Sequence, residues 1–427
     1  MTTTLIPGAV AVPERPSSTA WRVWVAALGV GLSVGLVSFL YQWSNGLGVT
    51  GLSNTVTWGM YIVSFMFLVG ASAGGLIVVA GSELVGTERF AALSRLAVVV
   101  SVAAVATAAG TILPDLGRPQ LAWRMITQPH LTSPLVWDMA VLLTYLVIGG
   151  VDLYLLSRPA VPGRAMRRMA QITLPLAVLV HSVTAWIFGL MVARPFWNTP
   201  LLAPLFITSA LVSGTALVIV VALVVRRTTP VAFDDRTLGA LAKLMLWFIA
   251  ADAFLLSAEV LTTLLSGSPD HQTQLRVILT GRLAPLFWSE VVLGVVVPFV
   301  VLANARWRTR PVVLGTVSVL AVVGVFFKRI NILLSSMFEP LVDLAPGLPG
   351  GRPGQPFDVA EVYLPTWVEW GVLLGMVAFF CTLVTLGVHH VVIPGHRSDS
   401  ADEGPGGAYD RADGPDRAAF GHPREDG

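Results

Sequence analysis

The chain contains 427 residues, of which 55% are hydrophobic and only 12% are charged, and its formal net charge is +2. A water-soluble domain of this size has too little interior to bury so much apolar surface. The composition therefore excludes an ordinary soluble protein and indicates a chain that lies in a lipid bilayer.

Apolar stretches of roughly 18 to 25 residues recur along the chain, and each can cross about 30 Å of hydrocarbon as a helix. None of them alternates between apolar and polar residues as the strands of a membrane barrel do. The sequence therefore predicts an all-α, polytopic transmembrane helical bundle with about ten membrane spans. In chain order, the predicted spans cover residues 22–43, 57–84, 94–113, 134–156, 170–192, 203–225, 241–266, 285–303, 312–330 and 366–389.

The two ends of the chain differ in composition from the spans. Residues 1–20 lack a cationic start before an early apolar run, so we expect no cleaved secretory signal there. Residues 393–427 are rich in Gly, Asp, Pro and Arg, which is typical of disorder. The predicted organisation is an N-terminal segment (1–20), a transmembrane domain (21–392) and a disordered tail (393–427).

Basic residues predict the orientation, because cytoplasmic loops of membrane proteins carry an excess of Lys and Arg. The loops on the side of the N-terminus are rich in them: Arg15, Arg22, Arg89, Arg95, Arg158, Arg164, Arg167, Arg168, Arg226, Arg227, Arg236, Lys243, Arg306, Arg308, Arg310 and Arg397. The opposite loops contain fewer: Arg118, Arg124, Arg194, Arg276, Arg282 and Arg352, besides Lys328 and Arg329 at a predicted helix end. We therefore expect both termini to be cytoplasmic.

Residues that could hold a redox metal are scarce. The single cysteine, Cys381, lies in the last predicted span and cannot hold an iron–sulfur cluster alone, so we interpret it as a packing residue. Haem b in a membrane takes paired histidines, but only His181 lies deep in a span, since His389 and His390 fall at the cytoplasmic end of the last one. We therefore expect no haem or iron–sulfur cluster in this chain.

Charged residues inside the spans need a physical reason, because an acid or base at a helix centre costs about 2.5 to 3.5 kcal/mol. The candidates are Asp138, Asp152, His181, Asp252, Glu259, Glu290, Lys328, Arg329 and Glu369. Most of them fall in the outer half of the predicted bundle, with His181 and Asp252 near mid-depth and Asp152 toward the cytoplasm. Asp252 and Glu259 are seven residues apart and so share a helix face.

A further polar motif, Asp115-Leu116-Gly117-Arg118-Pro119, stands where the third span ends and faces outward in this topology. Gly117 permits a tight chain reversal and Pro119 restricts the exit from it. The motif is either part of a functional site or a helix-ending turn closed by a local bridge between Asp115 and Arg118.

Three interpretations of the buried charges remain open. They form interhelical salt bridges, for instance Glu290 or Glu369 with Lys328 or Arg329. They bind a solute at the midplane, as in a secondary transporter. Or they line a quinone pocket, where an apolar cleft orients the head group and ionisable side chains move its protons. Histidine suits proton transfer because its ordinary pKa is near 6.5.

Local sequences resemble the NrfD or polysulfide-reductase membrane-subunit family. The resemblance covers about residues 20 to 390, and the most specific string is LPDLGRPQLAW. The other strings are TWGMYIVSFMFLVGASAGG (57–75), SPLVWD (133–138), LVIGGVDLYL (146–155), LPLAVLVHSVTAWIFGL (174–190), LLSAEVLTT (255–263), FWSEVVLGVVVP (287–298), RIN (329–331) and YLPTWVEW (363–370). Length and span count are similar to the longer branch, found in hydrogenase membrane subunits and in the alternative quinol-oxidising respiratory complex.

The resemblance implies roles for particular residues. Asp115, Arg118 and His181 would touch or orient a quinone head group, and they are the predicted catalytic residues. Trp58 and Tyr61 match the aromatic start of the second span and would help to bind the quinone, although anchors at the membrane interface explain them equally well.

Three further acids belong to a predicted proton route. Asp152 matches an acid near the end of the fourth span, and with Asp252 it would conduct protons from the cytoplasm. Glu259 and Glu369 also stand at matching positions, and we assign Glu259 to the same route.

The resemblance also implies cofactors and partners. The cofactor would be menaquinone or ubiquinone, bound by the transmembrane domain 21–392. The partners would be a peripheral iron–sulfur protein and a catalytic subunit, of the molybdopterin-enzyme or hydrogenase type, on the extracytoplasmic face of the bacterial cytoplasmic membrane. Membrane lipids, and no nucleic acid, complete the expected partners. The alternatives are a secondary transporter and a purely structural membrane anchor.

Overall fold

The structure is a computed structural model that describes residues 18–53, 56–85, 90–158, 163–194, 196–266, 269–338 and 363–393. Helices dominate these residues, and no strand occurs among them. The predicted terminal segments 1–20 and 393–427, and the polar loop near 339–362, lie mostly outside the described residues.

Ten helices in the described part of the chain are long and apolar enough to cross a membrane, which confirms the predicted polytopic all-α fold. The long helices are α1 (Ser18–Asn45), α2 (Met60–Val85), α3 (Ala91–Asp115), α5 (Pro134–Leu156), α6 (Gly163–Gly189), α7 (Leu202–Thr228), α8 (Asp235–Leu265), α13 (Pro311–Met337) and α14 (Trp367–Gly387). The tenth span joins α10 (Ala284–Ser289), the π-helical η4 (Glu290–Val296) and α11 (Val297–Ala303). The shorter helices are η1 (Leu47–Val49), η3 (Pro119–Leu121), α4 (Arg124–Thr127), α9 (Pro269–Leu279), α12 (Ala305–Arg308) and η5 (Val388–Val392).

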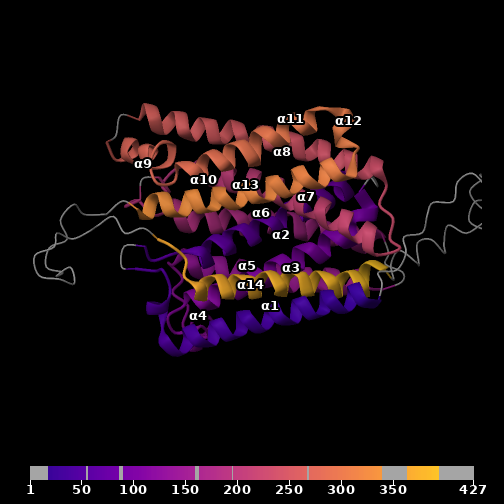
Figure 1. Cartoon of the computed structure of the whole chain (residues 1–427), viewed down its shortest axis with the longest axis horizontal. Helices are drawn as coiled ribbons and strands as arrows, with labels where there is room; N and C mark the ends of the chain where they lie inside the picture. The colour runs from indigo at the N-terminus through magenta and orange to yellow at the C-terminus, as the bar shows by residue number, and fades with distance from the viewer. Residues whose placement is uncertain are drawn as a thin grey trace, which may run out of the picture.

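The spans run alternately in the two directions, so the bundle has two ends (Figure 1). We call the end that contains Asp115 the Asp115 end; α4 and α9 lie there, and α12 lies at the opposite end. Ten spans among the described residues bring the start of α1 and the end of η5 to the same end of the bundle.

Two predicted boundaries are wrong for physical reasons. The ninth span does not stop at Lys328 and Arg329, because α13 continues to Met337 and neighbouring helices bury both charged side chains. Helix α6 begins at Gly163, not at residue 170, because its first turns carry Arg164, Arg167 and Arg168, which an apolar window excludes.

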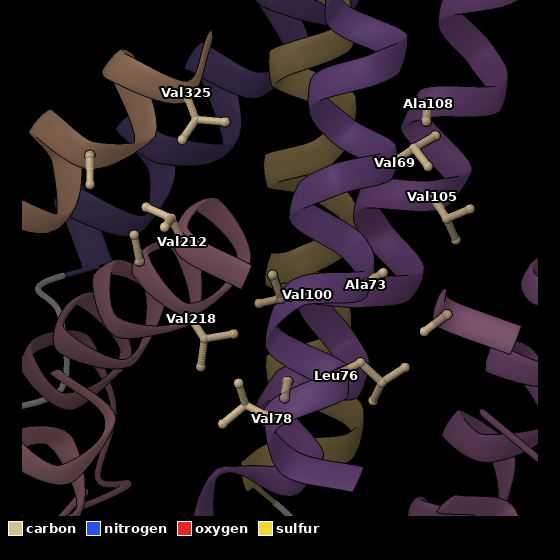
Figure 2. Packing of buried hydrophobic residues seen from close by; sticks show 14 of the residues in the cluster. Val69, Ala73, Leu76, Val78, Val100, Val105, Ala108, Val212, Val218 and Val325 are labelled. Atoms are coloured by element: carbon tan, nitrogen blue, oxygen red, sulfur yellow. The ribbon is translucent and has the colours of Figure 1, made fainter. Parts of the chain in front are cut away.

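Helix α2 is the most buried of the spans and forms the centre of the bundle. It packs against α3, α6, α7 and α13. Figure 2 shows Val69, Ala73 and Leu76 of α2 among valines of the neighbouring helices. Close approach needs small residues: a Cβ on Gly74 would overlap the carbonyl group of Ala210 in α7.

The turn after α3 forms as predicted, but not by the predicted means. Helix α3 ends at Asp115, and η3 begins at Pro119. The positive φ angle in the described residues belongs to Gly46, at 76°, and not to Gly117. The reversal at Gly117 therefore uses ordinary backbone angles.

A candidate quinone site and its buried charges

Asp115 belongs to a cluster of polar side chains from α1, α2 and α14. Its charge interacts with Tyr61 of α2 and Glu369 of α14, and its Oδ1 atom is buried without a hydrogen-bond partner. The Tyr61 hydroxyl donates to Gln42 Oε1 at 2.5 Å, and Gln42 Nε2 donates to the Pro114 carbonyl oxygen at 2.5 Å. Helix α1 thus fixes the end of α3 beside Tyr61.

Glu369 holds the same cluster together from α14. Its carboxylate is fully buried and accepts hydrogen bonds from the Gly51 amide at 2.7 Å, the Thr366 amide at 3.0 Å and the Tyr363 hydroxyl. The Met60 amide donates to the same hydroxyl at 2.8 Å. Burial, and then the Glu369 carboxylate, raise the pKa of Tyr363, so that this side chain stays a neutral donor. Glu369 is therefore satisfied by hydrogen bonds, whereas Asp115 keeps an unpaired oxygen.

Arg118 lies apart from this cluster. Its side chain is exposed, and the structure forms no ion pair between it and Asp115, although both residues are described. The local bridge considered for the motif is therefore absent. A role for Arg118 toward a ligand or a partner stays a prediction.

His181 lies deeper, in α6, at the centre of the bundle. The residue is 1% exposed, and neither ring nitrogen has a well-formed hydrogen bond. The ring interacts with the Ala177 carbonyl one turn earlier and with the charge of Arg329 in α13.

Gly70 of α2 lies between His181 and Arg329. A Cβ atom at this position would be 3.5 Å from His181 Nε2 and 3.6 Å from Arg329 Nη2. Arg329 is fully buried, and its Nη2 donates to Ser209 Oγ at 2.8 Å, while its Nε and Nη1 atoms lack partners. Two buried polar side chains with unused hydrogen-bonding atoms thus flank a residue without a side chain.

A series of aromatic rings in contact extends from Arg329 toward the Asp115 end of the bundle. The guanidinium of Arg329 lies 4.1 Å from the ring centroid of Phe206. The Phe206 ring lies 6.2 Å from Phe188, and Phe188 lies 5.6 Å from Trp58. Trp58 also stacks on Trp197 at 6.0 Å. Trp58 is therefore half-buried against Phe188 and Trp197, and does not belong to an isolated interfacial belt.

A second group of charges lies between α8, η4 and α13. Lys328 Nζ donates to both carboxylate oxygens of Asp252 at 2.7 Å, and Thr208 donates to the same carboxylate at 2.9 Å. Asn331 donates to Glu290 Oε2 at 2.7 Å. The prediction that Glu290 or Glu369 pairs with Lys328 or Arg329 is wrong, because α8 brings Asp252 nearer to the ammonium group.

Two cavities adjoin this second group. One has a volume of about 40 Å³; its polar lining residues are Glu259, Glu290, Lys328 and Asn331, among apolar side chains of α7, α8, α9 and α13. The other has a volume of about 10 Å³ and is lined by Asp252, Glu290 and Lys328 with Gly294 and Gly324. Glu259 accepts a hydrogen bond from Thr199 at 3.0 Å.

Asp152 lies near the opposite end of the bundle, as the topology predicted. It shares a cavity of about 10 Å³ with Glu83 of α2 and Thr173, and its charge interacts with Glu83. Its Oδ1 atom is buried without a partner, while Glu83 accepts a hydrogen bond from Ser94 at 3.0 Å. Sequence reasoning missed Glu83, although a carboxylate at the end of the second span was the available signal.

The structure separates the predicted site residues into groups. Gly70, which adjoins His181, follows Tyr61, which adjoins Asp115, by nine residues of α2, or about 13 Å along the helix. Sequence reasoning interpreted Arg329 only as a salt-bridge partner and missed its place beside His181. Asp138, the remaining buried acid of α5, accepts a hydrogen bond from Thr184 at 2.6 Å, one turn after His181.

Comparisons with known proteins agree on one family. The profile of the family described as polysulphide reductase, NrfD matches residues 48–339. A protein of Halobacterium salinarum, provisionally named as a membrane subunit of dimethyl sulfoxide reductase, is 33% identical over 91% of this chain and 95% of its own length. The Hdr-like menaquinol oxidoreductase integral membrane subunit of Archaeoglobus fulgidus is 25% identical over 82% of this chain and 88% of its own length. The menaquinone reductase integral membrane subunit of Nitratidesulfovibrio vulgaris is 22% identical over 89% of this chain and 93% of its own length.

Proposed function

The chain belongs to the polysulphide reductase NrfD family, and from that premise we propose that it is an integral membrane subunit of an oxidoreductase complex that binds a quinone or quinol. Two similar proteins carry menaquinol or menaquinone in their names, which supports this class of cofactor. The proposed complex includes a peripheral iron–sulfur protein and a catalytic subunit. These partners would dock at the Asp115 end, on the extracytoplasmic face of a bacterial cytoplasmic membrane.

The observation that carries the proposal is the position of the His181 and Arg329 side chains beside Gly70. A quinone head group is a flat apolar ring with oxygen atoms that accept or donate hydrogen bonds. His181 presents its unpartnered Nε2 beside Gly70, and Arg329 presents Nη2, which also donates to Ser209. Phe206 and Phe188 supply apolar surface nearby. Hydrogen-bonding nitrogens beside aromatic surface are the kind of groups that hold a quinone oxygen, which supports this class of cofactor.

The chain's own residues would hold the head group and move its protons. A bound quinol supplies two electrons and two protons. His181 would accept or donate a hydrogen bond through Nε2, and Arg329 would donate one and stabilise negative charge in a site without water. Asp115 and Arg118, toward the Asp115 end, would orient the cofactor where it meets its redox partner, with Trp58 and Tyr61 beside the entry.

Buried acids would connect the site with water. Asp152, with Glu83, lies near the opposite end of the bundle, and Asp252 and Glu259 adjoin the two cavities of the second charged group. We propose Asp152, Asp252 and Glu259 as members of a proton route. If the route carries protons through the membrane, quinol turnover contributes to the proton gradient.

The test removes the imidazole and keeps the helix. In the purified complex, His181→Gln is expected to lower quinol-linked electron transfer about 100-fold or more, since the positioned acid–base group is lost. It should also lower the amount of quinone that copurifies with the complex. The control is Ser182→Ala, a half-buried residue next in sequence, on the face of α6 that carries the exposed Val178 and Trp186, where both quantities should stay unchanged.

Two other outcomes would separate the alternatives. Loss of assembly in both His181→Gln and His181→Ala would favour a packing role and a purely structural anchor. A gene without neighbours that encode a cluster-bearing protein, together with normal electron transfer in His181→Gln, would favour a transporter.

A further inference from the structure

Glu290 has an unusual place in the second charged group. It is the first residue of η4 and is 3% exposed. The Asn331 amide donates to Oε2, but Oε1 is buried without a partner. Burying an ionised carboxylate is costly unless its oxygens are paired, so this oxygen is the natural place for a proton.

The charges that face Glu290 do not neutralise it by contact. Lys328 and Arg329 of α13 and Asp252 of α8 interact with it electrostatically, and Glu259 of α8 lines the same cavity. Both oxygens of Asp252 hold the Lys328 ammonium group, and Arg329 bonds to Ser209. Lys328 is thus held by Asp252, and in the described residues neither Lys328 nor Arg329 forms an ion pair with Glu290, which leaves Oε1 open to a proton.

Glu290 lines both cavities, as does Lys328. The cavity of about 40 Å³ includes Asn331 and Ile332, toward the Asp115 end of α13, and the cavity of about 10 Å³ includes Gly324 and Val325, toward the opposite end. A water molecule needs roughly 10 to 15 Å³, so the larger cavity has room for a few and the smaller for about one. Glu290 is the carboxylate that lines both.

The backbone at Glu290 departs from a regular α-helix. It forms a π-helical segment over Glu290–Val296, a feature that often marks functional sites. Gly294 and Gly324 line the smaller cavity, and they lie so close that a Cβ on Gly294 would be 2.8 Å from the Gly324 Cα atom. The wall of this cavity beside Glu290 is therefore partly backbone.

We propose that Glu290 is a proton-binding site that takes up a proton from water in one cavity and releases it to water in the other. In each transfer the Oε1 atom accepts a proton from hydronium, leaving water, and later returns it to a second water molecule. This proposal depends on the proposed function in one respect only: quinol turnover would drive the proton transfer.

The first experiment measures the proton itself and contains no quinone. Infrared difference spectra of the purified protein between acidic and alkaline pH should show a carboxylic-acid band that disappears in Glu290→Gln. Asp138→Asn is the matched control, because it removes another buried acid but should keep the Glu290 band. If Glu290→Gln retains every titrating carboxylic-acid band of the native protein, the proposal is wrong.

The second experiment measures transfer in the whole complex, reconstituted in vesicles. Glu290→Gln is expected to slow proton movement across the membrane about 100-fold or more, and Asp138→Asn should leave it unchanged. Native rates in Glu290→Gln would overturn the proposal. Failure of the His181 test leaves the infrared result interpretable, since that measurement does not depend on a bound quinone.

Discussion

At the scale of single residues, Gly70 and Gly74 lie one turn apart on α2, but a side chain would meet different neighbours at the two positions. A Cβ atom at Gly70 would lie at ordinary contact distances, 3.5 Å from His181 Nε2 and 3.6 Å from Arg329 Nη2. At Gly74 a Cβ would overlap the backbone of α7, so the helices would have to separate. Close packing of α2 against α7 therefore requires glycine at position 74, whereas a methyl group at position 70 would meet its neighbours at ordinary distances.

We therefore expect Gly70→Ala and Gly74→Ala to have different effects. Gly70→Ala should assemble normally and hold less quinone, because its methyl group fills the space between His181 and Arg329. Gly74→Ala should lower the thermal stability of the complex. Quinone content and the midpoint of thermal unfolding, measured on both variants, check this; equal quinone content in Gly70→Ala and the native complex would argue against the proposed head-group site.

At the scale of elements, α8 and α13 are joined by a buried ion pair. Removing one partner of such a pair leaves an uncompensated charge, which costs about 3 to 5 kcal/mol, whereas replacing both partners by apolar groups is often neutral. The pair also keeps Lys328 away from Glu290, so it shapes the charge around the smaller cavity.

Asp252→Asn alone is accordingly expected to destabilise the bundle by about 3 to 5 kcal/mol. The double variant Asp252→Asn with Lys328→Met should recover most of that stability. Unfolding of the purified protein in detergent, followed for both variants, measures the coupling. Independent, additive effects of the two substitutions would mean that the pair does not join these helices.

At the scale of the whole molecule, ten spans among the described residues place the start of α1 and the end of η5 on one side, and the excess of basic residues predicts that this side is cytoplasmic. The Asp115 end would then face outward with α4 and α9. The exposed side chains there include Trp123, Ile126 and Leu131, which offer apolar surface to a docked partner.

Cysteine labelling tests this orientation. In a Cys381→Ser background, Gln128→Cys at the Asp115 end should react with a membrane-impermeant maleimide in intact cells. Thr309→Cys, at the opposite end, should react only after the membrane is opened. If Thr309→Cys reacts in intact cells and Gln128→Cys does not, the Asp115 end faces the cytoplasm, and the proposed docking face is wrong.

Much of the fold could be predicted from the sequence, because hydrocarbon thickness and the cost of exposed backbone polar groups act on composition and length. Boundaries such as that of α13 could not, since an apolar window ends at Lys328 while tertiary contacts bury that residue. In the candidate site, His181 and Asp152 were recognisable as costly residues. The place of Arg329 beside Gly70 was not, because nothing along the chain relates α2 to α13.

The sequence by itself determined how many helices cross the membrane and which ionisable residues lie within them, since both follow from the cost of placing each side chain in hydrocarbon. The tertiary structure alone decided how those charges are used. Asp252 and Lys328 are 76 residues apart, and they meet because two helices pack side by side. The same packing leaves atoms of His181, Arg329 and Glu290 unpaired, because it brings no complementary group within hydrogen-bond distance of them.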